Sequence, residues 1–168
     1  PTTPPTGPIV PKLLSESRRG PFAVRRLLAG LGYQETINFS FVDERWEREL
    51  AGNATPIRLM NPIASQMSVM RSSLLGSLLQ VIKFNIDRRA DRVRVFEVGS
   101  VFLRDATVES TDSTVEGFRQ PTRVAGVAYG AVDRVQWGQR SRNADFFDVK
   151  GDIEALIAPR RARFEPAE

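Results

Sequence analysis

The stretch RVRVFEVGSVFL, residues 92–103, contains the strongest β-strand pattern in the chain. Its apolar side chains alternate between the two faces of an extended strand, with Val93, Val95 and Val101 on one face and Phe96, Val98 and Phe102 on the other. Because both faces are largely apolar, the pattern predicts a central strand that other elements cover on both sides.

Glu97 interrupts this apolar strand with a carboxylate. A buried carboxylate needs a partner, and Arg71, Arg92 and Arg94 are the candidates. A lone acid in a sheet can act as a catalytic base, but an ion pair that stabilises packing is the more common arrangement. We therefore favour the ion pair.

Apolar residues at helical spacing predict three longer helices around this strand. They cover residues 17–31 or 21–31, residues 72–87 or 73–87, and a segment that begins after Asp145. Their apolar faces consist of Val24, Leu27, Leu28 and Leu31 in the first, Leu74, Leu75, Leu78, Leu79 and Ile82 in the second, and Val149, Ile153, Leu156 and Ile157 in the third. A short helix should follow Asp43, a good N-cap residue, with Trp46 and Leu50 turned inward.

Alternating apolar residues predict further strands at residues 35–42, 56–60 and 123–131. In the first of them Ile37, Phe39 and Phe41 share one face. The polar residues 104–121 predict a surface loop or a loose hairpin. Strands and helices do not alternate strictly, so their order favours an α+β fold, with an antiparallel or mixed sheet flanked by helices, over a parallel doubly wound fold.

The 168-residue chain contains no cysteine and no histidine. Their absence excludes disulfides, thiolate nucleophiles, cysteine-based metal sites and most histidine-activated nucleophiles. The net charge of +4 is compatible with an RNA-handling protein, although interspersed acidic residues are also typical of an ordinary solvated surface. No apolar run approaches the roughly 18 residues that would indicate a membrane span.

The first residues, PTTPPTGPIVP, contain too many prolines for a helix or a central strand. We expect residues 1–14 to be a linker from a preceding module and residues 15–168 to form one domain.

Two short motifs have a structural and a functional interpretation. Gly30 and Gly32 lie between a predicted helix and a strand, so they cap a helix C-terminus and do not cradle a phosphate. Residues 61–71, NPIASQMSVMR, could be a substrate-facing loop, but a connection whose methionines fill the edge of the core is the simpler interpretation.

A third candidate motif interleaves aromatic and basic residues: Phe84 with Arg88, Arg89 and Arg92, and Trp137 with Arg140 and Arg142. The tryptophan could stack on nucleic-acid bases, although a loop anchored by a single tryptophan is the more ordinary interpretation. No recognised RNA-binding motif accompanies these residues.

Four segments together resemble a known family. They are residues 30–46, GLGYQETINFSFVDERW, residues 59–89, LMNPIASQMSVMRSSLLGSLLQVIKFNIDRR, residues 93–102, VRVFEVGSVF, and residues 136–156, QWGQRSRNADFFDVKGDIEAL. In this order and spacing they resemble the β subunit of bacterial phenylalanyl-tRNA synthetase over roughly residues 1–160. The segment from Met60 to Phe102 is the most specific part of the match.

The resemblance implies a fold similar to a class II aminoacyl-tRNA synthetase domain, in a catalytic-like module that is truncated at its C-terminus. It also implies a cytoplasmic (αβ)₂ enzyme, in which this module packs against the catalytic α subunit. The whole enzyme attaches phenylalanine to tRNA(Phe) with ATP and Mg²⁺. For this chain alone the resemblance implies no catalytic, cofactor-binding or metal-binding residue, and it leaves direct contact with the tRNA open.

Active class II domains have a strand ending Phe-Arg-x-Glu, whose arginine binds the α-phosphate of ATP. The similar stretch here is Phe102-Leu103-Arg104-Asp105, with Leu103 in the place of that arginine. Leucine cannot donate a hydrogen bond to a phosphate or neutralise its charge. Arg104 does not replace it, because consecutive strand residues point to opposite faces. The resemblance therefore implies a non-catalytic module.

Other departures concern the remaining class II motifs. Phe39 stands where the first motif of active enzymes has a proline, and the glycine-rich third motif has no counterpart. The helix face formed by Val24, Leu27, Leu28 and Leu31 is a candidate interface with the α subunit, or it packs within the domain. Two alternative functions remain for this chain: a stand-alone RNA-binding module and a degenerate class II adenylate-forming enzyme.

Overall fold

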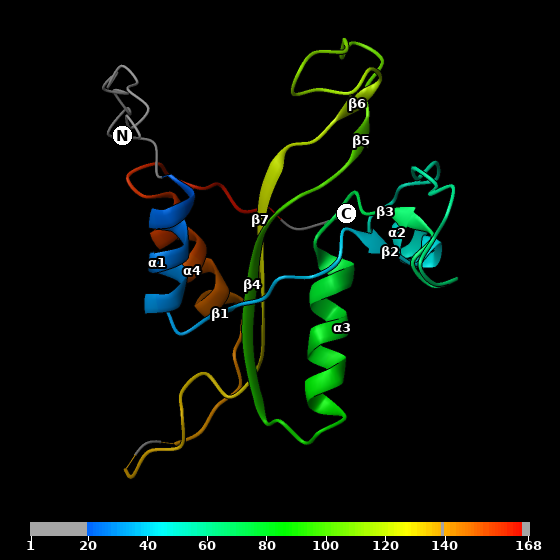
Figure 1. Ribbon diagram of the computed structural model, residues 1–168. Helices are drawn as coiled ribbons and strands as arrows, with labels where there is room; N and C mark the ends of the chain where they lie inside the picture. The colour runs from blue at the N-terminus through cyan, green and yellow to red at the C-terminus, as the bar shows by residue number, and fades with distance from the viewer. Residues whose placement is uncertain (1–19, 139, 166–168) are drawn as a thin grey trace, which may run out of the picture.

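A computed structural model describes residues 20–138 and 140–165. The predicted linker, residues 1–14, lies outside the described residues. The fold is α+β, as predicted (Figure 1). Its elements in chain order are α1 (Pro21–Gly30), β1 (Gln34–Glu35), β2 (Phe41–Val42), α2 (Glu44–Glu49), β3 (Val69–Met70), α3 (Leu75–Ile86), β4 (Arg92–Ser100), β5 (Leu103–Arg104), β6 (Phe118–Arg119), β7 (Thr122–Gly130) and α4 (Phe146–Ile157).

The main sheet has three strands in the order β1-β4-β7. β4 and β7 are antiparallel over nine residue pairs, from Arg92–Gly130 to Ser100–Thr122, and β1 is parallel to β4. The sheet is therefore mixed, and the predicted central position of residues 92–103 is confirmed. β5 and β6 extend the β4–β7 pair into a short second hairpin, so residues 104–121 form the hairpin that was one of the two expectations.

Helices cover both faces of this sheet (Figure 1). On one face α3 packs Leu78 and Ile82 against Val93 and Val95 of β4. On the other face Leu28 of α1, Tyr33 and Phe96 form a second apolar cluster, and Leu156 of α4 packs against it. The alternation of β4 divides its side chains between the two clusters, which is why both of its faces had to be apolar.

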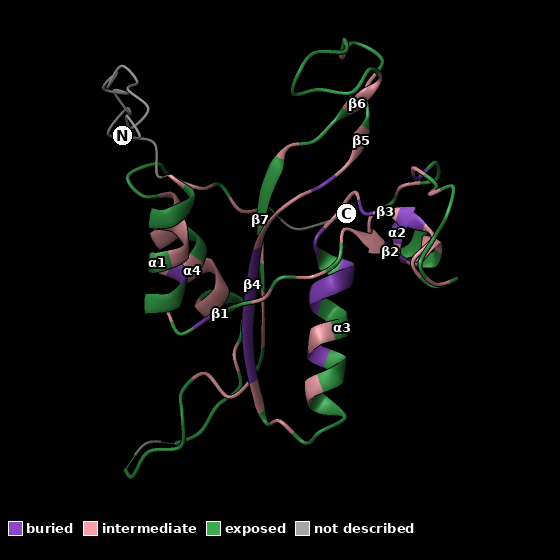
Figure 2. Ribbon diagram, in the orientation of Figure 1, coloured by how far each residue is buried: buried purple, intermediate pink, exposed green. Residues whose placement is uncertain are grey.

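Burial is uneven across the sheet (Figure 2). Five consecutive residues of β4, from Val93 to Glu97, are buried, whereas no residue of β7 or of α4 is buried. β7 pairs with β4 alone among the described strands, so its second edge is unpaired there. The buried core is therefore centred on β4, whereas β7 and α4 remain partly accessible to solvent and β7 has an unpaired edge in the described chain.

The prediction of one strand over residues 35–42 is wrong. Only β1 and β2 are extended there, and the connector between them exposes 94% of Ile37 and 62% of Phe39. The chain leaves the main sheet because β2 pairs with β3 instead of β4. Asn38 in the connector still contacts β4, donating its side-chain amide to Glu97 Oε2 at 2.8 Å.

Three smaller predictions also fail in part. Residues 56–60 contribute a single bridge, Arg58–Val69, and no strand. On α3, Leu74, Leu78 and Ile82 are buried but Leu75 and Leu79 are exposed, so the apolar stripe is narrower than predicted. On α2, Trp46 lies against Gly76, but the side chain turned fully inward is Glu47, and Leu50 is exposed.

Candidate functional site

Glu97 forms a buried ion pair with Arg71. Arg71 Nη1 lies 2.7 Å from Glu97 Oε1, and the two side chains are only 3% and 4% exposed. Arg71 also donates from Nε to the Ser100 carbonyl at 3.1 Å, and Asn38 donates to the second carboxylate oxygen. The ion-pair interpretation of Glu97 is confirmed, with Arg71 as the partner among the three candidates. A carboxylate paired in this way is not available as a base.

Gly99 gives this pair its space. A Cβ atom at position 99 would lie 2.5 Å from Arg71 Nη2 and 3.0 Å from Glu97 Oε1. Real Cβ atoms do not approach other atoms so closely, so a side chain at this position would force the ion pair apart.

A second polar cluster joins β4 to α4 on the opposite face of the sheet. Tyr33 donates its hydroxyl to Asp152 Oδ2 at 2.7 Å, and Arg94 Nη1 lies 3.3 Å from the same oxygen. Burial and the Asp152 carboxylate raise the pKa of Tyr33 to about 12. Nothing in the sequence relates Arg94 or Tyr33 to Asp152, because these positions are brought together only by the packing of α4.

Glu47 is a second buried acid, and sequence reasoning missed it. It accepts hydrogen bonds from the Ser72 backbone at 3.0 Å, from the Ser72 hydroxyl, and from Asn53 Nδ2 at 3.1 Å. These bonds join α2 to the segment before α3. The only sequence signal was helical spacing that turned position 47 inward together with Trp46.

Leu103, Arg104 and Asp105 lie at the start of the outer hairpin. Leu103 is half-buried, while Arg104 is exposed and donates from Nε to the Thr55 carbonyl at 3.3 Å. Hydrogen bonds from the Thr107 hydroxyl and backbone N–H hold the pKa of Asp105 below its usual range. Leu103 and Arg104 border a hollow of about 330 Å³ whose other walls include Thr55, and Leu103 offers no donor to it.

The candidate interface on α1 is largely used within the chain. Leu28 is 6% exposed and buried against Tyr33 and Phe96, and Val24 and Leu31 pack on the same cluster. Leu27 is half-buried and lies outside this cluster. Contact between this face and another subunit stays a prediction, and Leu27 is the residue most available for it.

The connection at residues 61–71 has mixed burial. Met67 and Met70 are half-buried, consistent with methionines at the edge of the core, but Met60 just before it is 97% exposed. Large exposed apolar side chains mark surfaces that contact other molecules when they gather in patches.

The loop between β7 and α4 projects from the sheet as an arm, defined here as residues 131–138 and 140–145. Its base is fixed by a bridge between Ala131 and Asn143, and by the Val132 N–H, which donates to the Arg142 carbonyl at 3.0 Å. Arg142 donates to both carboxylate oxygens of Asp148 at 2.6 Å, which holds the pKa of Asp148 well below its usual range.

Trp137 does not anchor this arm. Its relative exposure is 103%, so the interpretation of a loop anchored by one tryptophan is wrong. Backbone hydrogen bonds and the Arg142–Asp148 pair hold the arm at its base instead. The arm therefore needs no apolar anchor at its tip.

Within residues 20–138 and 140–165, no three histidine, cysteine, aspartate or glutamate side chains are placed to hold a metal ion together. None of the helices in these ranges is both long and apolar enough to cross a membrane.

Comparison with known proteins identifies the family. The family model described as phenylalanyl tRNA synthetase beta chain CLM domain matches residues 1–168. Relatives named phenylalanine–tRNA ligase beta subunit include that of Cupriavidus pinatubonensis, 58% identical over 92% of this chain, that of Burkholderia pseudomallei, 53% identical over 100%, and that of Bordetella pertussis, 52% identical over 86%. The chain spans 19%, 21% and 18% of these relatives, respectively. The chain therefore belongs to the phenylalanyl-tRNA synthetase β-chain CLM domain family.

Proposed function

We propose that this chain is a non-catalytic, class II-like module that packs against the catalytic α subunit of a phenylalanine–tRNA ligase. The complete enzyme is an (αβ)₂ assembly that attaches phenylalanine to tRNA(Phe), with ATP and Mg²⁺ bound by the α subunit. The family membership supports the β-subunit origin.

Leu103 is the observation that supports a non-catalytic role most directly. It stands where active class II domains have the arginine that binds ATP, and Arg104 beside it is engaged with the Thr55 carbonyl. The nearby buried acids, Glu47 and Glu97, are both satisfied by hydrogen bonds or an ion pair. Among the residues that the structure describes, no unpaired buried carboxylate is therefore left near this strand to act as a base.

The exposed apolar side chains support a role in packing against a subunit. Ile37 and Met60 are almost completely exposed, and Phe39 and Ile63 are largely so. They lie in the connector between β1 and β2 and in the loop before β3, two segments that both flank the small β2–β3 sheet. A partner that covered them would remove apolar surface from water, at about 25 cal/mol for each Å².

Co-purification with the α subunit tests this proposal. The chain and a tagged α subunit are co-expressed, and the complex is followed by size-exclusion chromatography. Ile37→Glu and Met60→Glu should weaken capture without lowering the melting temperature, because both side chains are exposed. Gln80→Glu is the control, because Gln80 is an exposed residue of α3, and it should leave capture unchanged. The packing role is wrong if the wild-type chain forms no complex at micromolar concentrations.

Phenylalanine-dependent exchange between ATP and pyrophosphate tests the absence of catalysis. The chain alone should show no exchange above background, and Leu103→Arg should not create any, because one arginine does not supply the other contacts of an adenylation site. Exchange by the wild-type chain would instead support the alternative of a degenerate adenylate-forming enzyme.

A further inference from the structure

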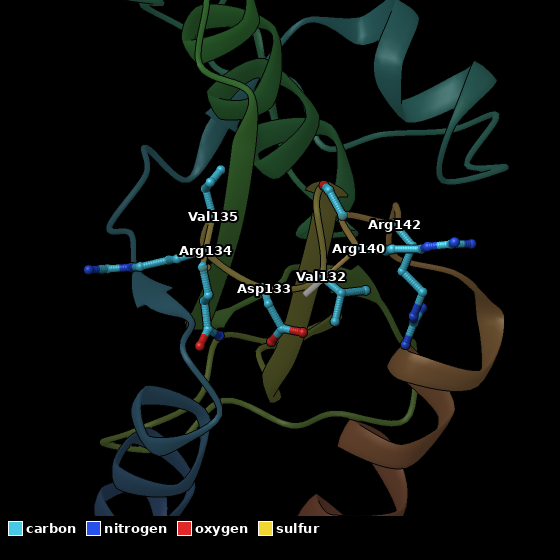
Figure 3. A pocket seen from close by; sticks show the side chains of 8 residues that line it. Val132, Asp133, Arg134, Val135, Arg140 and Arg142 are labelled. Atoms are coloured by element: carbon cyan, nitrogen blue, oxygen red, sulfur yellow. The ribbon is translucent and has the colours of Figure 1, made fainter. Parts of the chain in front are cut away.

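Two arginines of the arm have no partner for their charge. Within the described residues, the side chains of Arg134 and Arg140 form no hydrogen bond and no ion pair, and both are exposed. They extend to opposite sides of the arm (Figure 3). The described arm holds two carboxylates, Asp133 next to Arg134 and Asp145, which lies 3.6 Å from Arg142 Nη1. The arm therefore presents one arginine without an ion pair on each side.

A groove leads from Arg134 toward the sheet. It has a volume of about 500 Å³ and lies between the arm, the start of β4 and the turn at Gly32–Gln34. Its charged lining consists of Arg92 and Arg134, of Asp91 and Asp133, and of Arg94, whose charge is paired with Asp152. Arg92 donates to the carbonyls of Ala131 and Val132, which fixes the wall of the groove at the base of the arm.

The tip of the arm adds an aromatic surface. Trp137 precedes Gly138, whose φ of +80° turns the chain, and the ring is fully exposed. Val135 is the only other exposed large apolar side chain in the described arm, and Gln136 separates it from Trp137. An anchor for a protein surface is normally part of a contiguous apolar patch, whereas a single ring with open faces suits stacking.

We infer that the arm binds unpaired RNA. Trp137 stacks on an exposed base, and Arg134 and Arg140 bind phosphates on either side of it. The groove beside Arg134 accepts the continuing backbone. This arrangement combines an aromatic platform with a positively charged path, the two features by which proteins hold single strands without reading their sequence. The inference goes beyond packing against the α subunit and does not depend on it.

Anisotropy of a fluorescently labelled oligouridylate tests the inference with the full chain. The wild-type chain should bind at about 50 mM salt and lose affinity steeply toward about 200 mM. Arg134→Gln and Arg140→Gln should each lower the slope of log affinity against log salt by about 0.7, the value for one phosphate contact on a single strand. Trp137→Ala should weaken binding by about 5- to 100-fold with little change in this slope, and Trp137→Phe should restore most of it.

Arg123→Gln is the matched control. Arg123 is an exposed arginine without an ion pair in the described chain, and it lies near the other end of β7 from the arm. Its substitution removes the same charge but should leave the salt slope unchanged. A blunt RNA duplex should bind more weakly than the oligouridylate, because its bases are not free to stack.

Three results would overturn the inference. They are no binding by the wild-type chain at about 50 mM salt, an unchanged affinity in Trp137→Ala, and an equal loss in Arg123→Gln and Arg134→Gln. Capture by the α subunit is measured on the same variants. If the arm variants lose α-subunit capture but keep RNA binding, the arm is a protein-docking element and the RNA site is wrong. If they keep capture and lose RNA binding, both proposals stand.

Discussion

Arg71 and Glu97 lie at the same distance as an exposed ion pair elsewhere in the chain, and only their burial differs. The Arg71 Nη1–Glu97 Oε1 distance is 2.7 Å, and so is the Lys83 Nζ–Asp87 Oδ2 distance on α3. The first pair is 3% and 4% exposed, whereas the second is 75% and 55% exposed. Water solvates the second pair in either state, but removing one partner of the first leaves a charge without solvent.

Arg71→Met should therefore lower the free energy of unfolding by about 3–5 kcal/mol, because it leaves the Glu97 carboxylate buried and unpaired. Lys83→Met should change it by less than about 1 kcal/mol. Urea unfolding followed by circular dichroism measures both. The double variant Arg71→Met/Glu97→Leu should be more stable than Arg71→Met alone; a double variant that is less stable than both single variants would contradict this account of the pair.

Gly99→Ala should also destabilise the domain, since its Cβ would lie 2.5 Å from Arg71 Nη2. The expected loss is about 1–3 kcal/mol, typical of a forced shift in a packed interior. Gly151→Ala is the control. Gly151 lies within α4 with open space around it, so alanine there should stabilise the helix by about 0.5–1 kcal/mol. Equal effects of the two substitutions would show that the space at Gly99 is not limiting.

Stability at high pH should depend on Tyr33. Its folded pKa is raised to about 12, above the value of about 10 in an unfolded chain. The folded state therefore keeps a proton that the unfolded state loses. Stability from Tyr33 is complete below about pH 10 and decreases as the pH rises toward 12. The urea midpoint should fall over this window, and the fall should be smaller in Tyr33→Phe. If the urea midpoint of the wild-type chain changed with pH in the same way as that of Tyr33→Phe, Tyr33 would not be the group that links stability to pH.

Neighbouring leucines of α1 separate core packing from a subunit contact. Leu28→Asp should unfold the domain, with a loss of at least about 4 kcal/mol, because it buries a charge between Tyr33 and Phe96. Leu27→Asp should keep the fold, since Leu27 is half-buried outside that cluster. If α1 contacts the α subunit, Leu27→Asp should still weaken capture in the co-purification assay. If the α subunit captured Leu27→Asp as well as the wild type, this face of helix α1 would not be part of the subunit contact.

The sequence predicts the centre of this fold better than its margins. β4 has a pattern that only a doubly covered strand needs, so its position and both faces were predictable. Residues 35–42 have an equally regular alternation, yet Ile37 and Phe39 are exposed. An alternating pattern shows that one face of a segment is apolar. It does not show whether that face is buried within the chain or contacts another molecule, because both cases give the same pattern.

The candidate site shows the same limit. The sequence limits the candidate partners of Glu97 to three arginines, because a buried acid requires a cation. The Tyr33–Asp152 hydrogen bond could not be predicted, because it joins positions 119 residues apart through the docking of α4. The exposure of Trp137 was also beyond the sequence, since tryptophans in loops are usually partly buried and only packing decides the exception.

The position of Leu28 has a consequence for the synthesis of the chain. Leu28 is buried against Phe96, which is translated 68 residues later. At about 5–20 residues per second, the apolar face of α1 stays without its partner for roughly 3–14 s after it is made. Throughout this interval the nascent helix exposes a face that it will later bury. Chaperones that bind apolar helices therefore have this interval in which to bind α1, before β4 leaves the ribosome.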